Sequence, residues 1–511
     1  MTGTLGHWLI APVLLPAVVG PLIILWMREE LPLARVFSLC ATAAQLVLAA
    51  WLLAQAAGGE IFVYRLGNWQ VPFGIALMLD RLSALMLLLT ATLALLVQLY
   101  AIGSGWDRRG AHFHALFQFQ LMGLTGAFLT GDAFNLFVFF EVLLIASYGL
   151  MAHGGGGMRL RASIQYVITN LAGSALFLAA LGTIYAATGT LNMVDLAQRT
   201  AALPADQTAL LRVGAVLLML VFAIKAALVP LHFWLPATYA NAPGPVAALF
   251  SIMTKVGLYG IVRFYTLVFP PGGGAGTLVA DLLLPAAAAT LVLGQAGVMG
   301  SRDLGRMASW AALASVGTLT LAVARFTPQG ISAGLFYLIH STLATAALFL
   351  VADLIARRRG SLRLVPGPSI PQGGLIAVFL MAAGVAIVGL PPLSGFLGKI
   401  AVLKASTGTG WTVAVWTAVL MTSLMAIVGL ARAGSAIVWS AGTTPPPARA
   451  ADPADPAEWL ALAATGAMLA GLAVLTLAAG PVMRFTDATA AQLSDPAPYV
   501  EAVLVRQEGA K

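Results

Sequence analysis

Long apolar segments follow one another along almost the whole chain, and they set the first limit on its fold. Of the 511 residues, 60% are hydrophobic and only 9% are charged, whereas soluble domains carry about 25% charged residues. Runs of this length can cross a membrane as helices, and they lack the period-two alternation of barrel strands. Because backbone groups in lipid must be hydrogen-bonded within the chain, we predict an all-α polytopic membrane protein.

Charges, glycines and prolines divide the chain into about fourteen candidate transmembrane helices. We expect a single transmembrane domain over residues 1–480 and a short C-terminal tail over 481–511. The predicted spans are 7–27, 34–56, 75–100, 112–131, 132–152, 161–188, 209–231, 243–269, 277–299, 304–325, 331–356, 373–407, 411–440 and 457–480.

The distribution of Lys and Arg between the loops predicts the orientation of these helices. Loops after odd-numbered helices carry more basic residues than loops after even-numbered ones, and Arg263 is counted among the latter. Since cytoplasmic loops are rich in Lys and Arg, both termini are expected on the outer face.

Two predicted helices, the seventh and the twelfth, are interrupted. The first interruption reads KAALVPLHFWLP from Lys225, and the second reads GLPPLSGFLGK and ends at Lys399. Proline removes a helix donor and glycine loosens the turn, so both helices should be broken at membrane depth. Broken helices at matching places in two five-helix sets, about 112–269 and 277–440, predict inverted repeats with a transport site at the breaks.

Three ionisable residues, Glu141, Lys225 and Lys255, lie deep within apolar helices. A charge at the bilayer centre costs ~2.5–3.5 kcal/mol and usually marks an ion path or a proton relay. Glu141 is interpreted as the partner of Lys225, because a carboxylate that approaches or recedes would make the lysine hold or release a proton. The alternative for Glu141 is a structural carboxylate that pins helix packing. Snorkelling does not suit Lys255, which lies near mid-span rather than at a helix end.

Further candidates lie in the second half of the chain and after the first interruption. Lys399 follows the second interruption as Lys225 precedes the first, so we expect it to be a terminal proton site. His340 suits a shuttle between lysines, since imidazole titrates near physiological pH, although a lone buried histidine is often only hydrogen-bonded. His232 and Trp234 either line a water-filled cavity or pack against the broken helix.

Other functions find no support in the sequence. The arginines are scattered rather than gathered on one face, which argues against nucleic-acid binding despite a net charge of +8. The single cysteine, Cys40, excludes a disulfide framework and a cysteine metal site. Haem-type histidine pairs, a zinc-protease motif and a phosphate-binding lysine loop are missing from the sequence. We therefore expect no metal, no cofactor and no enzymatic active site.

Several of these segments resemble the antiporter-like proton-translocating subunits shared by respiratory complex I, membrane-bound hydrogenases and Mrp-type cation/proton antiporters. The resemblance covers roughly residues 60–440 and rests on GDAFNLFVFFEVLLIASY, HFWLPATYANAPGPVAALFSIMTKVGLYG and GLPPLSGFLGK. It implies a fold of fourteen helices with two inverted repeats. It also implies a hydrated mid-membrane chain, with Glu141 and Lys225 as the coupling pair, Lys255 as the central relay and Lys399 as the terminal site.

Within this family, the stretch NLFVFFEVLLIASY with the histidine-glycine turn after it looks most like the D subunits of the Mrp-type branch, and two departures from the family pattern bear on this choice. The chain has Ala237, Thr238 and Tyr239 where many complex I relatives have Asp-Ala-His, and Ala344 where they have a lysine. His340 therefore stands without that lysine.

The resemblance implies a subunit of a hetero-oligomeric Na⁺(K⁺)/H⁺ antiporter in the bacterial cytoplasmic (inner) membrane. The cation would cross in another subunit, since no cluster of carboxylates forms a Na⁺ site in the sequence. The alternatives are a proton-pumping subunit of a redox enzyme, an energy-coupling subunit for inorganic-carbon uptake, and a membrane scaffold without transport. The mid-membrane lysines argue against the scaffold, because insertion alone favours apolar residues there.

Overall fold

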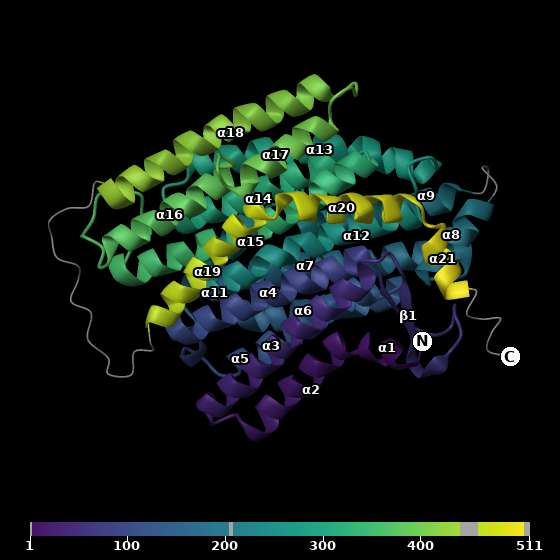
Figure 1. Cartoon of the computed structure of the whole chain (residues 1–511), viewed down its shortest axis with the longest axis horizontal. Coiled ribbons are helices and arrows are strands. Elements are labelled where there is room, and N and C mark those ends of the chain that lie inside the picture. The colour runs from purple at the N-terminus through teal and green to yellow at the C-terminus, as the bar shows by residue number, and fades with distance from the viewer. Residues whose placement is uncertain (1–2, 204–207, 440–457, 505–511) are drawn as a thin grey trace.

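A bundle of long helices makes up nearly all of the computed structural model, which describes residues 3–203, 208–439 and 458–504. The helices run side by side across the molecule in Figure 1. Among the described residues, 11 helices are long and apolar enough to cross a membrane, and Ala11–Trp26 and Gly373–Val388 are shorter apolar helices. The predicted all-α membrane fold is therefore confirmed, while the count of fourteen and the repeats stay predictions.

The first half of the chain holds the N-terminal helices and the first interruption. Its helices are α1 Gly3–Trp8, α2 Ala11–Trp26, α3 Leu31–Ala56, α4 Arg81–Ser104, α5 Phe113–Leu129, α6 Ala133–Ala152, α7 Gly157–Thr188, α8 Met193–Ala202, α9 Ala209–Ala226, α10 Trp234–Asn241, α11 Gly244–Leu249 and α12 Met253–Leu267. Short 3₁₀ turns are η1 Leu66–Asn68, η2 Trp106–Arg108 and η4 Phe250–Ile252.

The second half of the chain also consists mainly of long helices and contains the second interruption. Its elements are α13 Gly274–Gly300, α14 Leu304–Val323, α15 Pro328–Arg359, α16 Gly373–Val388, α17 Ser394–Ala405, α18 Thr412–Gly434, a π-helical turn η5 Ser435–Trp439, α19 Glu458–Leu477, α20 Ala479–Ser494 and α21 Ala497–Leu504. Residue 440 of the predicted second repeat and residues 505–511 of the predicted tail lie outside the described residues.

A small antiparallel hairpin of β1 Phe62–Arg65 and β2 Ala76–Leu79 precedes α4. Asp80 follows β2 directly and caps α4, because its carboxylate accepts a hydrogen bond from the Ser83 backbone amide at 2.9 Å. This N-cap satisfies a donor that the first helical turn leaves unpaired.

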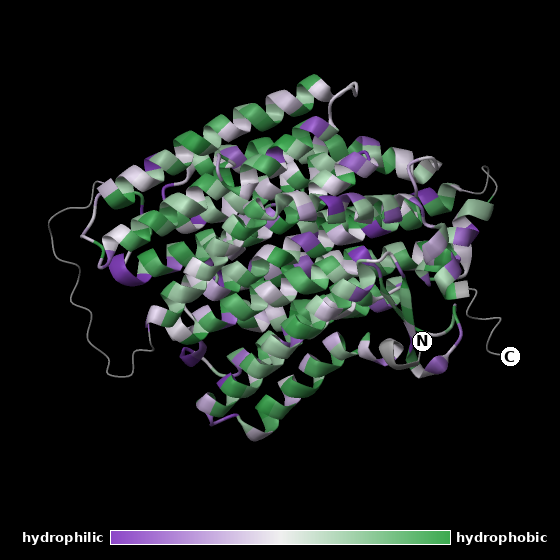
Figure 2. Ribbon diagram, in the orientation of Figure 1, coloured by the Kyte–Doolittle hydropathy of each residue, from purple (hydrophilic) through white to green (hydrophobic). Residues whose placement is uncertain are grey.

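The apolar residues cover the long helices, and hydrophilic residues gather toward the two ends of the bundle (Figure 2). Three helical segments lie in its interior: the segment Gly244–Leu267 is buried except at its first residue, and α14 and α15 are buried along almost all of their length. Polar side chains on these segments are therefore shielded from lipid and need partners within the protein or water.

Both predicted interruptions are present. The helix α9 ends at Ala226, Ala227 adopts a left-handed φ of 61°, and helical structure resumes at Trp234. The helix α16 ends at Val388, Gly389 has a φ of 77°, and α17 begins at Ser394.

The last described helices extend beyond the predicted span of 457–480. The helix α20 follows α19 after a single residue, and α20 packs along α15. Ser332 at the start of α15 donates a 2.6 Å hydrogen bond to Asp487. The beginning of the predicted tail is thus a packed helix that is continuous with the bundle.

Candidate functional site: a buried row of ionisable side chains

Lys225 lies in the last turn of α9, where the first interruption begins, and is only 4% exposed. Its Nζ donates a hydrogen bond to Asn170 Oδ1 on α7 at 3.3 Å, and it lies 5.9 Å from the centroid of the Phe140 ring. A cation at a helix C-terminus is favoured by the helix dipole. The broken helix therefore holds this lysine at membrane depth beside a neutral side-chain partner.

Glu141 on α6 is half-buried and accepts a short hydrogen bond from Ser174 on α7. Glu141 and Lys225 do not form a direct ion pair within 4 Å in the described part of the chain. The two members of the predicted coupling pair instead each bind a side chain of α7.

Asn170 and Ser174 stand four residues apart on α7, and each binds one member of that pair. Sequence reasoning missed both. The available signal was their spacing, because residues i and i+4 of a helix share a face and both fall in the predicted span 161–188.

Lys255 is 1% exposed, and its Nζ has no hydrogen-bond partner among the described residues. It lies on α12 just after the 3₁₀ turn η4, and Ser251 in that turn also has a buried, unpartnered hydroxyl within the described part of the chain. A buried ammonium without a partner is strongly unfavourable. The charge of Lys255 must therefore depend on water or a proton acceptor reaching it.

His340 on α15 is 1% exposed, and its Nδ1 lies 2.9 Å from the Ser394 hydroxyl at the start of α17. A Cβ on Gly395 would approach His340 Nε2 to 2.8 Å, so the glycine makes room for the ring. A cavity of about 10 Å³ borders the ring, between Gln295, Ser341 and neighbouring residues. That volume is near the minimum for one water molecule.

Lys399 lies on α17, after the second interruption, and is 9% exposed. Its Nζ donates hydrogen bonds to the carbonyl oxygen of Val388 at 2.7 Å and to the Ser423 hydroxyl of α18 at 2.8 Å. Val388 is the last residue of α16. The lysines at the two interruptions are therefore both associated with the C-terminal end of a half-helix.

The two residues after the first interruption have different surroundings. The indole Nε1 of Trp234 donates a 3.0 Å hydrogen bond to the carbonyl oxygen of Ile224, which lies in the last turn of α9. The ring of His232 lies 6.2 Å from that of Trp310. Trp234 thus packs against the end of the broken helix, where the Ile224 carbonyl also accepts from the Ala227 backbone amide at 3.1 Å.

The helices that carry these residues pack against one another in the order α6, α7, α9, α12, α15 and α17. A Cβ on Gly257 would come within 2.6 Å of the Ala226 backbone nitrogen, so α12 touches the end of α9 directly. The five predicted residues thus lie on successive helices that pack against one another, four of them buried and Glu141 half-buried, and we call them the row.

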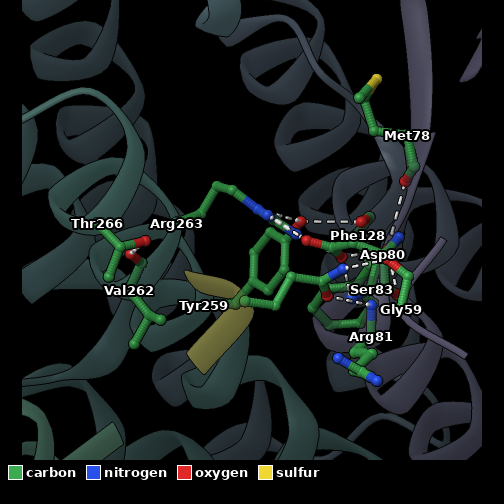
Figure 3. Close-up of polar contacts among 11 residues, drawn as sticks. Gly59, Met78, Asp80, Arg81, Ser83, Phe128, Tyr259, Val262, Arg263 and Thr266 are labelled. Carbon is green, nitrogen blue, oxygen red and sulfur yellow. Dashed lines mark hydrogen bonds and ion pairs between the residues drawn. The ribbon is translucent and has the colours of Figure 1, made fainter. Parts of the chain in front are cut away.

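A further buried ion pair shows that Arg263 is not the loop charge that the orientation prediction takes it to be. It lies inside α12 with 2% exposure and makes a bidentate pair with Asp80 at 2.6 and 2.8 Å. Figure 3 shows this pair beside Tyr259, whose hydroxyl donates to the Phe128 carbonyl. The prediction was wrong for this residue because α12 continues past it, and the arginine joins α12 to the start of α4.

The described residues contain no group of three or more His, Cys, Asp or Glu side chains placed to hold a metal ion. The charged row itself consists of three lysines, one histidine and one glutamate. It lacks the convergent oxygen ligands that hard cations need.

The fold and this row define a class of membrane subunit. Residues 130–426 match the family described as NADH:quinone oxidoreductase/Mrp antiporter, TM. Residues 65–103 match the family described as NADH-ubiquinone oxidoreductase (complex I), chain 5 N-terminus.

Individual relatives narrow this class. The chain is 39% identical to the D subunit of a probable K⁺/H⁺ antiporter of Rhizobium meliloti, over 99% of this chain and 98% of the relative. It is 35% identical to the D subunit of a Na⁺/H⁺ antiporter of Bacillus subtilis, over 98% of this chain and 100% of the relative. It also superposes on a chain of the Mrp complex from Dietzia sp. DQ12-45-1b with a TM-score of 0.88 and 28% sequence identity. The match covers 98% of this chain and 100% of the Dietzia chain. The chain therefore belongs to the NADH:quinone oxidoreductase/Mrp antiporter family and, within it, to the antiporter D subunits.

Proposed function

We propose that this chain is the proton-translocating subunit of a multisubunit monovalent cation/proton antiporter, in which proton movement is coupled to efflux of Na⁺ or K⁺. One observation carries the proposal: five ionisable side chains, Glu141, Lys225, Lys255, His340 and Lys399, lie in one row through consecutive packed helices. Such residues within a membrane are expensive and are retained for ion or proton movement. The antiporter names of its relatives point the same way.

In this proposal Lys399 is the terminal site. A proton that arrives there is stabilised by the Val388 carbonyl and the Ser423 hydroxyl. His340, hydrogen-bonded to the Ser394 hydroxyl through Nδ1 and to the Ala386 backbone, would pass the proton from Lys399 to Lys255. Lys255 is the central relay, because its lack of a partner among the described residues leaves the proton free to move on.

The last step is controlled at the coupling pair. A proton on Lys225 is held by Asn170 and by the attraction of Glu141. When Glu141 is drawn toward Ser174 the attraction weakens, and when it turns toward Lys225 the attraction strengthens. Movement of this one carboxylate would therefore decide when Lys225 releases its proton.

The same reasoning extends to the surroundings of the chain. We propose inverted five-helix repeats over about 112–269 and 277–440, a location in the bacterial inner membrane with both termini outside, and a cation path in another subunit. Glu141, as the half-buried end of the row, is the natural contact for a neighbouring subunit. The chain is then a transporter subunit and not a catalytic enzyme.

The test is cation-driven proton movement in membrane vesicles that contain the assembled complex. Lys255→Met and Lys225→Met should each lower the initial rate more than tenfold while the partner subunits still co-purify. Lys404→Met is the matched control, because Lys404 lies in the exposed last turn of α17. Full exchange in both interior variants would remove the row from the mechanism. Co-purification of flavin or iron–sulfur subunits would instead favour a redox-driven pump.

A further inference from the structure

A second set of buried polar side chains runs between α2, α3, α4 and α5, apart from the charged row. We call it the N-terminal seam. Its members are Gln98 of α4, Ser38, Thr42 and Gln45 of α3, and His114, Gln118 and Thr125 of α5, all buried. These four helices pack together. None of these residues takes part in the relay proposed above.

The seam begins at the face that holds the α2–α3 and α4–α5 turns. There His114 Nε2 lies 3.1 Å from Asp107 Oδ2, and Arg35 binds the same carboxylate at 2.6 and 2.9 Å. A cavity of about 160 Å³ opens onto Asp107 and His114, and its wall also includes Arg28, Glu29 and His112. Water in this cavity would therefore meet a carboxylate–imidazole pair.

The middle of the seam is a hydrogen-bonded cluster of neutral side chains. Ser38 Oγ accepts hydrogen bonds from Gln98 Nε2 at 2.7 Å and Gln118 Nε2 at 2.9 Å. Gln118 Nε2 also lies 3.1 Å from the Thr42 hydroxyl, and His114 Nδ1 lies 3.5 Å from Gln98 Nε2. The Oε1 atoms of Gln98 and Gln118 are buried and lack partners among the described residues. Buried amide oxygens normally have a partner, which is water where protein supplies none.

The deep end of the seam is created by a proline. Pro16 has no backbone N–H to pair with the carbonyl of Pro12, four residues earlier in α2. That carbonyl accepts instead from Gln45 Nε2 and from the Thr125 hydroxyl, both at 2.9 Å. Gln45 lies fourteen residues after the start of α3, or about 20 Å along the helix at 1.5 Å per residue. Gln45 therefore lies near the middle of α3, whose 26 residues extend over about 39 Å.

We propose that the N-terminal seam is a hydrated half-channel for protons. Protons enter it at His114, and its deep end is the Pro12 carbonyl. In it a proton from the cavity binds one imidazole nitrogen of His114, and the other nitrogen gives up its proton to seam water. Ser38 and Thr42, whose hydroxyls both donate and accept, carry it inward. The inference rests on the proposed function, since it gives a proton-translocating subunit a second access route.

Protons fit this seam better than a metal cation does. Two amide groups turn their N–H donors toward Ser38 at its centre. A desolvated Na⁺ or K⁺ needs several convergent oxygen ligands, and N–H donors cannot serve as ligands. Neutral groups that donate and accept hydrogen bonds suit proton transfer through water instead.

The first experiment compares rates of cation-driven proton movement in vesicles with the assembled complex. Ser38→Ala and Gln118→Leu should lower the initial rate at least fivefold, and Ser38→Thr, which keeps a hydroxyl, should restore most of it. Thr90→Val is the matched control, because Thr90 is equally buried on α4 but bonds to the Met86 carbonyl of its own helix. It should change the rate less than twofold. Normal rates in assembled Ser38→Ala and Gln118→Leu complexes would reduce the seam to a structural contact and overturn the inference.

The second experiment detects water without relying on those variants. Cys40 is the only cysteine, so Cys40→Ala gives a thiol-free chain. In that background Thr42→Cys should be inhibited at least fivefold by Ag⁺, a soft ion that binds thiolates, whereas Thr90→Cys should not. Equal resistance of both would contradict a hydrated seam. Lys255→Met separates the two proposals: if it abolishes exchange while the seam variants remain active and silver-resistant, only the half-channel fails.

Discussion

Lys399 Nζ donates a 2.7 Å hydrogen bond to the backbone carbonyl of Val388, the last residue of the half-helix α16. A side chain that follows the interruption thus caps the helix that precedes it. The contact places a cation on the negative end of a helix dipole. It ties the position of Lys399, the proposed terminal proton site, to the geometry of the interruption.

Gly389 should be essential to this arrangement. It has a φ of 77°, and an added Cβ would lie 2.8 Å from Lys399 Cδ. Gly389→Ala is therefore expected to strain the backbone by ~1–3 kcal/mol, displace the lysine and lower exchange more than tenfold. Gly384→Ala on the same helix is the control, since a Cβ there would contact nothing within 4 Å. Equal exchange rates in the two variants would contradict the role given to Gly389.

The α7 side chains should matter for the coupling pair. Asn170→Leu removes the hydrogen bond that holds the Lys225 ammonium, so exchange should fall at least tenfold. Ser174→Ala frees Glu141 and should change exchange by a smaller factor. Thr169→Val is the control, because Thr169 is only partly buried on α7 and bonds to the Gln165 carbonyl of its own helix. Initial rates in vesicles with equal complex content test this order.

The Asp80–Arg263 pair should govern stability rather than transport. Arg263→Met leaves a buried, unpaired carboxylate, which should cost ~3–5 kcal/mol. The double variant Asp80→Asn with Arg263→Met should recover part of this loss, because the uncompensated charge is removed. Thermal unfolding of the purified complex measures both effects. Additive losses in the double variant would show that the two residues do not act as a pair.

Asp107 provides a pH-dependent prediction at the membrane face. Burial raises the pKa of this carboxyl, but hydrogen bonds from His114 and Arg35 outweigh it and hold the pKa below its usual value. The stabilisation is therefore complete above the unfolded pKa of about 3.9 and is lost as pH falls through the lower folded value. Asp107→Asn should melt earlier than wild type at pH 7, and the difference should shrink below about pH 4.

A control separates that effect from charge removal in general. Asp195 forms an i,i+4 pair with the half-exposed Arg199. Such surface pairs contribute about 0–1 kcal/mol, so Asp195→Asn should leave the melting temperature nearly unchanged at both pH values. A constant difference between Asp107→Asn and wild type at every pH would rule out the proposed linkage.

The strongest features of the fold were predictable because they depend on local chemistry. Proline and glycine cannot continue a helix, so both interruptions could be located from the sequence. The lysines of the row could be singled out from the sequence, because a charged residue within a long apolar segment is rare. By contrast, the continuation of α19 into α20 through residues 479–494 could not be foreseen, since that stretch is less apolar than a transmembrane span.

The supporting residues were harder to predict. Asn170 and Ser174 are small neutral side chains, and such residues are common in membrane helices for packing alone. Arg263 resembles a loop charge in the sequence, because its partner Asp80 comes from a distant segment. The hydrogen bond from Trp234 to the Ile224 carbonyl could not be predicted, because the two residues lie on different helices. These roles arise from contacts between helices, which one sequence does not reveal.

Gly257 sets the mechanical character of the row. Its lack of a side chain lets α12 rest on the backbone of Ala226, so the spacing between the Lys225 and Lys255 helices is fixed by main-chain contact. Backbone contacts of this kind do not adjust by rotamer changes as side-chain packing does. The two helices cannot approach more closely at this point, so a shorter distance between the two ammonium groups would have to come from rotation of the lysine side chains.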